Sequence, residues 1–309
     1  MPDTVALPAV ETHRDDAGRG FGFVHVPHAG ATDLVVHFSA FFGAWGNAKP
    51  YRDQFQGYFH RLKMLGSDPG HNWLFLCDAY GAFDNGTYYT GERGDLFVER
   101  AMTRIIDRHL DDHGYRGRPL VTVGSSMGAT AALKFGLDLD ADGIVAICPH
   151  IDLDVCAARQ DRMAEVAWIC PDGDALAEHN HPITRQIRTR LKDRRDRPLP
   201  RLYVQSCEDD VGVHDEQVIP LVQRWRGAGG EAVTDFRPVG GHTSDHATRA
   251  VLLDAVGALA TGDPIDVERY RSDPAYAGTL VRPPLTHRVR RAASLGRKRV
   301  LSALRPDGR

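Results

Sequence analysis

The sequence predicts an α/β fold with a mainly parallel central sheet flanked by helices. Short apolar runs alternate with stretches of helical spacing, which is the rhythm expected of βα units. The runs from residue 73 onward show little polar alternation, so we expect strands buried on both faces. The run over residues 120–123 leads directly into a Gly-Ser-Ser-Met-Gly turn and an alanine-rich stretch, which predicts a strand, a sharp turn and a helix.

The other elements follow from the same patterns. Strands are expected over residues 22–26, 34–39, 73–78, 120–123, 143–148, 202–207 and 232–236. Helices are expected over residues 51–65, 95–112, 129–137, 216–226 and 244–259. The glycines at positions 227, 229 and 230 end the fourth of these helices.

The composition is that of an ordinary soluble globular protein, with 42% hydrophobic and 26% charged residues. No apolar stretch reaches the roughly 18 residues of a membrane span, and residues 1–16 show no apolar signal segment. We therefore expect a cytoplasmic location. The five cysteines are odd in number and lack CxxC spacing, which favours buried free thiols over disulfides or a zinc site.

Residues 150–199 interrupt the βα rhythm with a polar stretch that contains several prolines. We expect a small insertion or lid after the sixth strand, and we expect its arginine-rich part, residues 185–197, to be a solvated helix face. The predicted organisation is an N-terminal extension over residues 1–20, the α/β domain over residues 21–262 and a basic tail over residues 263–309.

The basic tail stands out against an acidic body. Residues 282–309 hold nine basic residues and one acid, so this segment carries +8 within a total of −3 and leaves −11 for residues 1–281. An amphipathic helix on an anionic membrane or a glycan-assembly complex is one interpretation. Pro283, Pro284 and Gly296 break the periodicity and favour a solvated, disordered tail. Nucleic acid is not an expected partner, because the tail lacks interleaved aromatics that would stack on bases.

Ser126 is the candidate nucleophile, at the apex of the turn between strand and helix. A nucleophile there needs small residues two positions before and after it, and Gly124 and Gly128 meet that need. The helix behind the serine points unpaired N–H groups and a positive dipole end toward a developing oxyanion. A five-residue motif of this kind also arises by chance, so the flanking strand and helix carry the prediction.

A serine nucleophile needs a base, and the base needs an acid to orient it. Asp209 and Asp210 follow the strand at 202–207, and His242 follows the strand that ends near residue 236. We favour Asp210 as the acid because Asp210 to Val213 has Asp-x-x-Val spacing, but Asp209 stays open and a solvated turn explains both. The order Ser, Asp, His differs from the orders of chymotrypsin and subtilisin.

Three further predictions concern the surroundings of Ser126. The N–H groups of Met127 and Phe41 are the expected oxyanion donors, although an aromatic core turn explains Phe41 equally well. Tyr80, Tyr88 and Tyr89 lie in a glycine-rich loop after the strand at 73–78, and we expect them to line a site for sugars or acyl chains. A packed surface loop is the alternative.

Two histidine patterns raise the question of a metal site. His109 and His113 have i, i+4 spacing, and His242 and His246 lie close together in the sequence. No HExxH motif and no obvious third ligand accompany them, so we expect no metal.

The strand, turn and helix around Ser126, the later Asp210 and the final His242 resemble the α/β-hydrolase superfamily over roughly residues 20–261. Three stretches, at 78–91, 124–128 and 241–245, resemble the accessory secretion system proteins that O-acetylate glycans on serine-rich adhesins. That resemblance implies acyl transfer to a carbohydrate, with Ser126, an acid from the Asp209 and Asp210 pair, and His242 in the catalytic roles.

The function expected from these observations is serine-dependent acyl transfer, as a carboxylesterase or as a glycan O-acetyltransferase. The expected substrate is a small-molecule or glycan ester. We expect no bound cofactor, with acetyl-CoA or another acyl donor entering as a co-substrate. The alternative is a non-catalytic α/β-hydrolase-fold component of a glycan-assembly or export complex, recruited by its basic tail.

Overall fold

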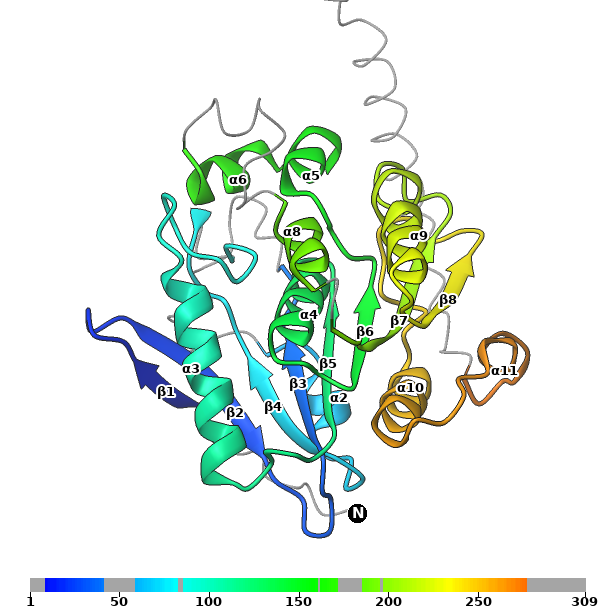
Figure 1. Ribbon diagram of the computed structural model, residues 1–309, viewed down its shortest axis with the longest axis horizontal. Coiled ribbons are helices and arrows are strands. Elements are labelled where there is room, and N and C mark those ends of the chain that lie inside the picture. Colours follow the sequence, from blue (N-terminus) through cyan, green and yellow to red (C-terminus); the bar gives the residue numbers. More distant parts are fainter. Residues whose placement is uncertain are drawn as a thin grey trace, which may run out of the picture.

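An eight-stranded sheet with helices on both faces forms the body of the molecule (Figure 1). The computed structural model describes residues 9–41, 59–82, 86–160, 162–171, 185–194 and 197–276. The strands lie in the order β1-β2-β4-β3-β5-β6-β7-β8. Pairs β1–β2 and β2–β4 are antiparallel, and the pairs from β4 to β8 are parallel.

The strands are β1 (Glu11–Arg14), β2 (Gly20–Val26), β3 (Leu34–Phe38), β4 (Asn72–Leu76), β5 (Leu120–Ser125), β6 (Gly143–Ile147), β7 (Arg201–Cys207) and β8 (Ala232–Arg237). The helices are α2 (Leu62–Leu65), α3 (Phe97–Asp112), α4 (Met127–Asp138), α5 (Leu153–Gln160), α6 (Met163–Ile169), α8 (Gln186–Asp193), α9 (Ile219–Gly227), α10 (Arg249–Thr261) and α11 (Val267–Ser272), with a π-helical turn η2 (His214–Val218) before α9.

Alternation along the strands divides the core between the two faces of the sheet. On one face, Leu34 and Leu120 pack with side chains of α3, α4 and α9. On the other face, Val35 and Val121 pack with side chains of α10 and with Leu65 of α2. Strands β3, β4 and β6 are buried at every position, because helices cover both of their faces.

The structure confirms the predicted α/β fold, the mainly parallel sheet and all seven predicted strands to within two residues at each end. Strand β8 differs from the expected full burial: it is only half-buried, since it is the outer strand at its edge. Of the helix expected over residues 51–65, only the last turn, α2, lies among the described residues. The helix expected over residues 216–226 is split into η2 and α9.

Two described elements lie outside the range of residues 21–262 that we expected for the α/β domain. Residues 11–14, which we assigned to an N-terminal extension, form the edge strand β1 and pair with β2 from Glu11 to Arg14. Residues 263–276, which we assigned to the tail, include α11, whose Tyr270 is buried in the core. A short strand and a short helix carry too little apolar periodicity to reveal such packing in the sequence. The basic residues from 282 onward lie outside the described residues.

We expected the arginine-rich part of the insertion to be a solvated helix face. Its arginines instead form ion pairs with the body of the domain. Arg190 on α8 forms ion pairs with Glu99 of α3 and Asp138 of α4 at 2.7 and 2.9 Å. Glu99 also pairs with the buried Lys134 of α4 at 3.0 Å, and Arg194 binds Asp140. These contacts attach α8 to the helices on one face of the sheet. None of the described helices is long and apolar enough to cross a membrane.

Candidate active site

Ser126 lies in a strained turn at the carboxyl end of the sheet. Strand β5 ends at Ser125 and helix α4 begins at Met127, so Ser126 is the single residue between them. Its backbone has φ of 53° and ψ of −119°, a combination that non-glycine residues rarely adopt. The Ser126 N–H donates to the Ile147 carbonyl at 2.8 Å, and the Ser126 carbonyl accepts from Ala129 and Thr130. These bonds hold the turn in its strained conformation.

Both flanking glycines are sterically required. A β-carbon on Gly124 would lie 2.0 Å from the Gly128 carbonyl oxygen, and one on Gly128 would lie 2.3 Å from the Phe38 carbonyl oxygen. The turn therefore closes only because neither residue has a side chain.

A chain of hydrogen bonds joins the three predicted residues. The Ser126 hydroxyl lies 2.8 Å from His242 Nε2, and His242 Nδ1 lies 2.8 Å from Asp210 Oδ2. Asp210 is buried, while His242 is partly exposed. When Nδ1 donates to the carboxylate, Nε2 keeps a lone pair and accepts the serine proton. The three residues come from loops after β5, β7 and β8, which all end at the same edge of the sheet.

Asp209 occupies a different position from Asp210. Its carboxylate accepts hydrogen bonds from the N–H groups of Gly240 and Gly241 at 3.1 and 2.6 Å. It thus holds the loop that carries His242, and the structure places Asp210 against the imidazole.

Two other potential nucleophiles near Ser126 are less suited to that role. Burial and the nearby Asp210 carboxylate raise the pKa of the Cys148 thiol, and this thiol donates to the Thr243 carbonyl at 3.1 Å. The Ser125 hydroxyl accepts a 2.6 Å hydrogen bond from Arg61 and is buried. Of these groups, Ser126 is the one hydrogen-bonded to a histidine.

The first predicted oxyanion donor, Met127, lies at the start of α4. The N–H groups of the first helical turn have no partner within the helix, and Met127 is the first residue of α4. The second predicted donor, Phe41, follows β3, whose last carbonyl borders Gly128. The Phe41 ring lies under the Arg162 guanidinium, 4.0 Å from its carbon to the ring centroid.

The hydroxyls of all three predicted tyrosines form hydrogen bonds within the protein. Tyr89 donates to the carbonyls of Ser39 and Leu76 at 3.1 Å, and Tyr80 donates to Gly20 at 2.9 Å. The buried Asp78 carboxylate fixes the loop by accepting from the N–H groups of Thr87 and Tyr89. The hydroxyls of Tyr80 and Tyr89 thus satisfy backbone carbonyls, and the lining of a substrate site by these tyrosines stays a prediction.

Tyr88 contacts His150, a residue that the sequence analysis did not identify. Its hydroxyl contacts His150 Nδ1 at 3.1 Å and Cys156 Sγ at 3.2 Å. The His150 ring stacks on His242, with centroids 4.9 Å apart and planes inclined by 9°. His150 therefore restrains the orientation of the His242 ring. A signal was available, since His150 is a polar residue soon after β6 at the same edge as Ser126.

No protein-family model matches the chain. Two curated relatives do, and both are accessory Sec system proteins: one of Streptococcus gordonii, 30% identical over 126 residues, and one of Staphylococcus aureus (strain NCTC 8325 / PS 47), 24% identical over 135 residues. The matches cover 41% and 44% of this chain but only 21% and 23% of the relatives. The chain thus spans less than a quarter of the curated relatives it matches.

Solved structures resemble the chain over most of its length. The glycosylation-associated Gap123 complex of Streptococcus agalactiae matches with a TM-score of 0.61 and 19% identity, over 80% of this chain and 45% of that one. The capsule O-acetyltransferase of Neisseria meningitidis serogroup A matches with 0.59 and 16%, over 82% and 100%. The fluorophosphonate-binding serine hydrolase FphF of Staphylococcus aureus matches with 0.56 and 10%, over 82% and 97%. The chain therefore shares the α/β-hydrolase fold of these solved structures and has local sequence likeness to the two accessory Sec system proteins.

Proposed function

We propose that the protein is a serine-dependent acyl-transfer enzyme with Ser126, His242 and Asp210 as its catalytic residues. The observation that carries this proposal is the hydrogen-bonded chain from the Ser126 hydroxyl through His242 to Asp210, at 2.8 Å for each bond. The strained turn supports it, because such strain is typical of a nucleophile held at the end of a strand.

The proposed reaction has two stages. Ser126 Oγ attacks the carbonyl carbon of an ester or thioester while His242 Nε2 takes the hydroxyl proton. The N–H of Met127, with that of Phe41, stabilises the oxyanion. His242 returns the proton to the leaving alcohol or thiol, and an acyl group stays on Ser126. A water molecule or a sugar hydroxyl, deprotonated by His242, then attacks the acyl carbonyl carbon. The bond from that carbon to Ser126 Oγ breaks, and His242 returns the proton to this oxygen.

The proposed acceptor is a glycan, and the proposed donor is acetyl-CoA or another acyl ester. Likeness to the accessory Sec system proteins and to a capsule O-acetyltransferase supports the acceptor. A structure of that O-acetyltransferase is in complex with CoA, which supports a thioester donor. One structural relative belongs to the Gap123 complex, so we also propose a protein partner. The basic segment from residue 282 onward would contact that partner. An anionic membrane surface is the alternative contact for this segment.

Fluorophosphonate labelling followed by peptide mass spectrometry tests the nucleophile. We expect an adduct on Ser126 in the wild type and none in Ser126→Ala. Ser125→Ala is the matched control, because it removes the neighbouring hydroxyl and should keep the adduct. We expect Ser126→Ala to lower p-nitrophenyl acetate turnover by about 10⁴-fold or more.

The same assay separates an enzyme from a non-catalytic scaffold. No adduct in the folded wild type, or equal labelling of Ser126→Ala, would contradict the proposal and favour the scaffold. An acetyl group retained on Ser126 after exposure to acetyl-CoA would identify acetyl-CoA as a donor. Acyl transfer to an added oligosaccharide would distinguish a transferase from a hydrolase.

A further inference from the structure

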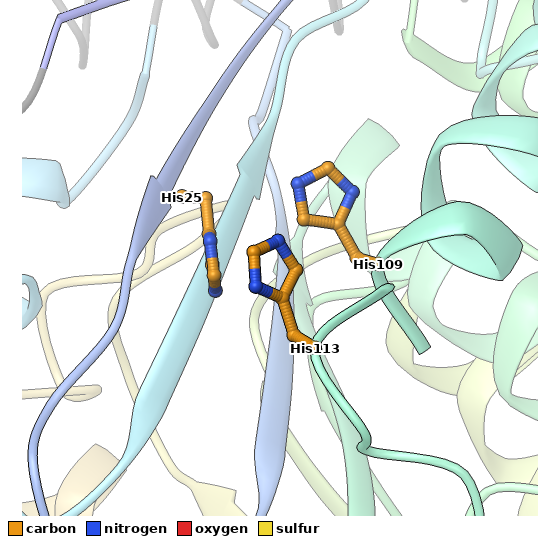
Figure 2. A group of neighbouring side chains, drawn as sticks. All are labelled: His25, His109 and His113. Carbon is orange, nitrogen blue, oxygen red and sulfur yellow. The ribbon is translucent and has the colours of Figure 1, made fainter. Parts of the chain in front are cut away.

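Three histidines that are distant in the sequence meet on the outer part of the sheet. His25 comes from β2, His109 from the last turn of α3, and His113 follows that helix (Figure 2). One potential ligand atom from each lies within 4.8 Å of the other two. The ring centroids of His25 lie 5.0 Å from His109 and 4.4 Å from His113, and those of His109 and His113 lie 5.3 Å apart.

Secondary-structure periodicity brings the three side chains together. Alternation along β2 puts His25 on the same face as Phe21 and Phe23, the face that packs against α3. On α3, His109 continues the buried stripe that includes Met102 and Ile105, and the i, i+4 spacing sets His113 above it. At the end of an apolar interface between strand and helix, imidazoles thus replace the expected aliphatic side chains.

The hydrogen bonds of two of the rings suit metal ligation. His109 Nδ1 donates to the Ile105 carbonyl at 2.7 Å, so its Nε2 carries a lone pair. His25 Nε2 lies 3.2 Å from the Tyr115 hydroxyl, and donation to that oxygen leaves a lone pair on His25 Nδ1. Metal-binding histidines commonly use their second nitrogen in this way.

The local charge also suits a cation. The cluster lies at the carboxyl end of a 16-residue helix, where the helix dipole is negative. The acids whose charge reaches His109 are Glu11 on β1 and Asp112 on α3.

We propose that His25, His109 and His113 bind one divalent transition-metal ion, Zn²⁺ in the first place, through three imidazole nitrogens. Neutral imidazoles select zinc and its neighbours over Mg²⁺ or Ca²⁺, and three protein ligands leave a fourth position for water. A tetrahedral site with Zn–N bonds of about 2.0–2.1 Å needs nitrogens about 3.4 Å apart. The ligand atoms of the three rings lie within 4.8 Å of one another, so binding would draw the rings closer together.

The site would link β2 to α3 at a distance from the catalytic residues. His113 precedes β5, and the site therefore lies toward the amino end of the parallel strands. Ser126 lies beyond their carboxyl ends. The ion would have a structural role, stabilising the outer strands against α3, and would take no part in acyl transfer.

Zinc binding to the tag-free, chelator-treated full-length protein tests the proposal. We expect one equivalent of Zn²⁺ per chain by calorimetry, and a rise in melting temperature of about 5 °C at a free zinc concentration 100 times Kd. His113→Ala removes an exposed ligand with little risk to folding. We expect it to weaken binding by more than about 100-fold, because loss of a ligand costs more than loss of a ligand's outer hydrogen-bond partner. His13→Gln is the matched control, because His13 lies on the neighbouring strand β1 outside the cluster and should bind as the wild type does.

A second set of donors, Cys148, Asp210 and His242, lies within the candidate active site. Zinc bound there would block labelling of Ser126, so labelling is measured in the same titration. Retained labelling together with a loss of binding in His113→Ala supports the three-histidine site. Wild-type affinity in His113→Ala, or no stoichiometric binding, would overturn it and leave an aromatic packing cluster; neither result bears on the acyl-transfer proposal.

Discussion

At the scale of single residues, neighbouring groups of the same type have separate environments. Asp209 and Asp210 are adjacent in the sequence, yet one binds two backbone N–H groups and the other binds His242. Ser125 and Ser126 are likewise adjacent, but only Ser126 lies against the imidazole. Because side chains of successive residues point in different directions, a one-residue step changes the partner completely.

Substitution of the two aspartates should separate orientation of the base from support of its loop. We expect Asp210→Asn to lower kcat for p-nitrophenyl acetate by about 10³- to 10⁴-fold, because the amide favours the wrong His242 tautomer. Asp209→Asn keeps an acceptor oxygen for Gly240 or Gly241 and should cost about tenfold. Steady-state kinetics on both variants measures this difference. A larger loss in Asp209→Asn would assign the acid role to Asp209.

At the scale of elements, the position of α4 depends on its closest approach to β3. Gly128 in the first turn of α4 lies against the carbonyls of Phe38 and Ser39 at the end of β3. Met127 and Ala129 on either side are buried in the core. Helix α4 therefore cannot move away from β3 without losing its packing on β5. The absence of a side chain at Gly128 lets α4 contact both strands.

Alanine at two helical glycines should have opposite effects on stability. In Gly128→Ala the new methyl group meets the Phe38 carbonyl oxygen at 2.3 Å, and we expect the free energy of unfolding to fall by about 3 kcal/mol. In Gly257→Ala, within α10, the atom nearest to the new methyl group is His71 Nε2 at 4.0 Å. The higher helix propensity of alanine should therefore raise the free energy of unfolding by about 0.5–1 kcal/mol.

Urea unfolding measures both changes, and fluorophosphonate labelling reports whether the turn survives. If Gly128→Ala kept wild-type stability and labelling, the close approach of α4 to β3 would not be required for folding or for the turn at Ser126.

At the scale of the whole molecule, buried neutral histidines make stability depend on pH. His37 is fully buried at the centre of β3, and burial, then the charges of Arg61 and His60, lowers its pKa well below 6.5. Burial and Arg61 lower the pKa of His60 to about 3. In the unfolded chain both rings regain an ordinary pKa near 6.5. Below that pH the unfolded chain binds protons that the folded protein does not, so stability is lost as the pH falls.

The free energy of unfolding should therefore decrease from pH 6.5 to pH 4.5, by up to about 1.4 kcal/mol per pH unit for each such histidine. His37→Gln should remove one such contribution and flatten the slope, whatever its stability at pH 7. Urea unfolding at several pH values measures the slope, with His246→Gln as a control outside the core. Equal slopes in His37→Gln and wild type would mean that His37 takes up its proton in the folded state.

The sequence was sufficient for strands β2 to β8 and for the order of the three candidate catalytic residues. Buried parallel strands are continuous apolar runs, and the turn at Ser126 has strict local steric needs, so both leave a signal in consecutive residues. Strand β1 and helix α11 left none, because their place depends on pairing with β2 and packing beside β8.

Only the tertiary structure decided which side chains around the candidate active site and in the histidine cluster contact one another. It placed Asp210 rather than Asp209 against His242, stacked His150 on that ring, turned the hydroxyls of Tyr80 and Tyr89 toward backbone carbonyls, and brought His25 to His109 and His113. Contacts of this kind join residues from different strands and helices. Their geometry depends on the twist, register and packing of the whole sheet, which no local pattern encodes.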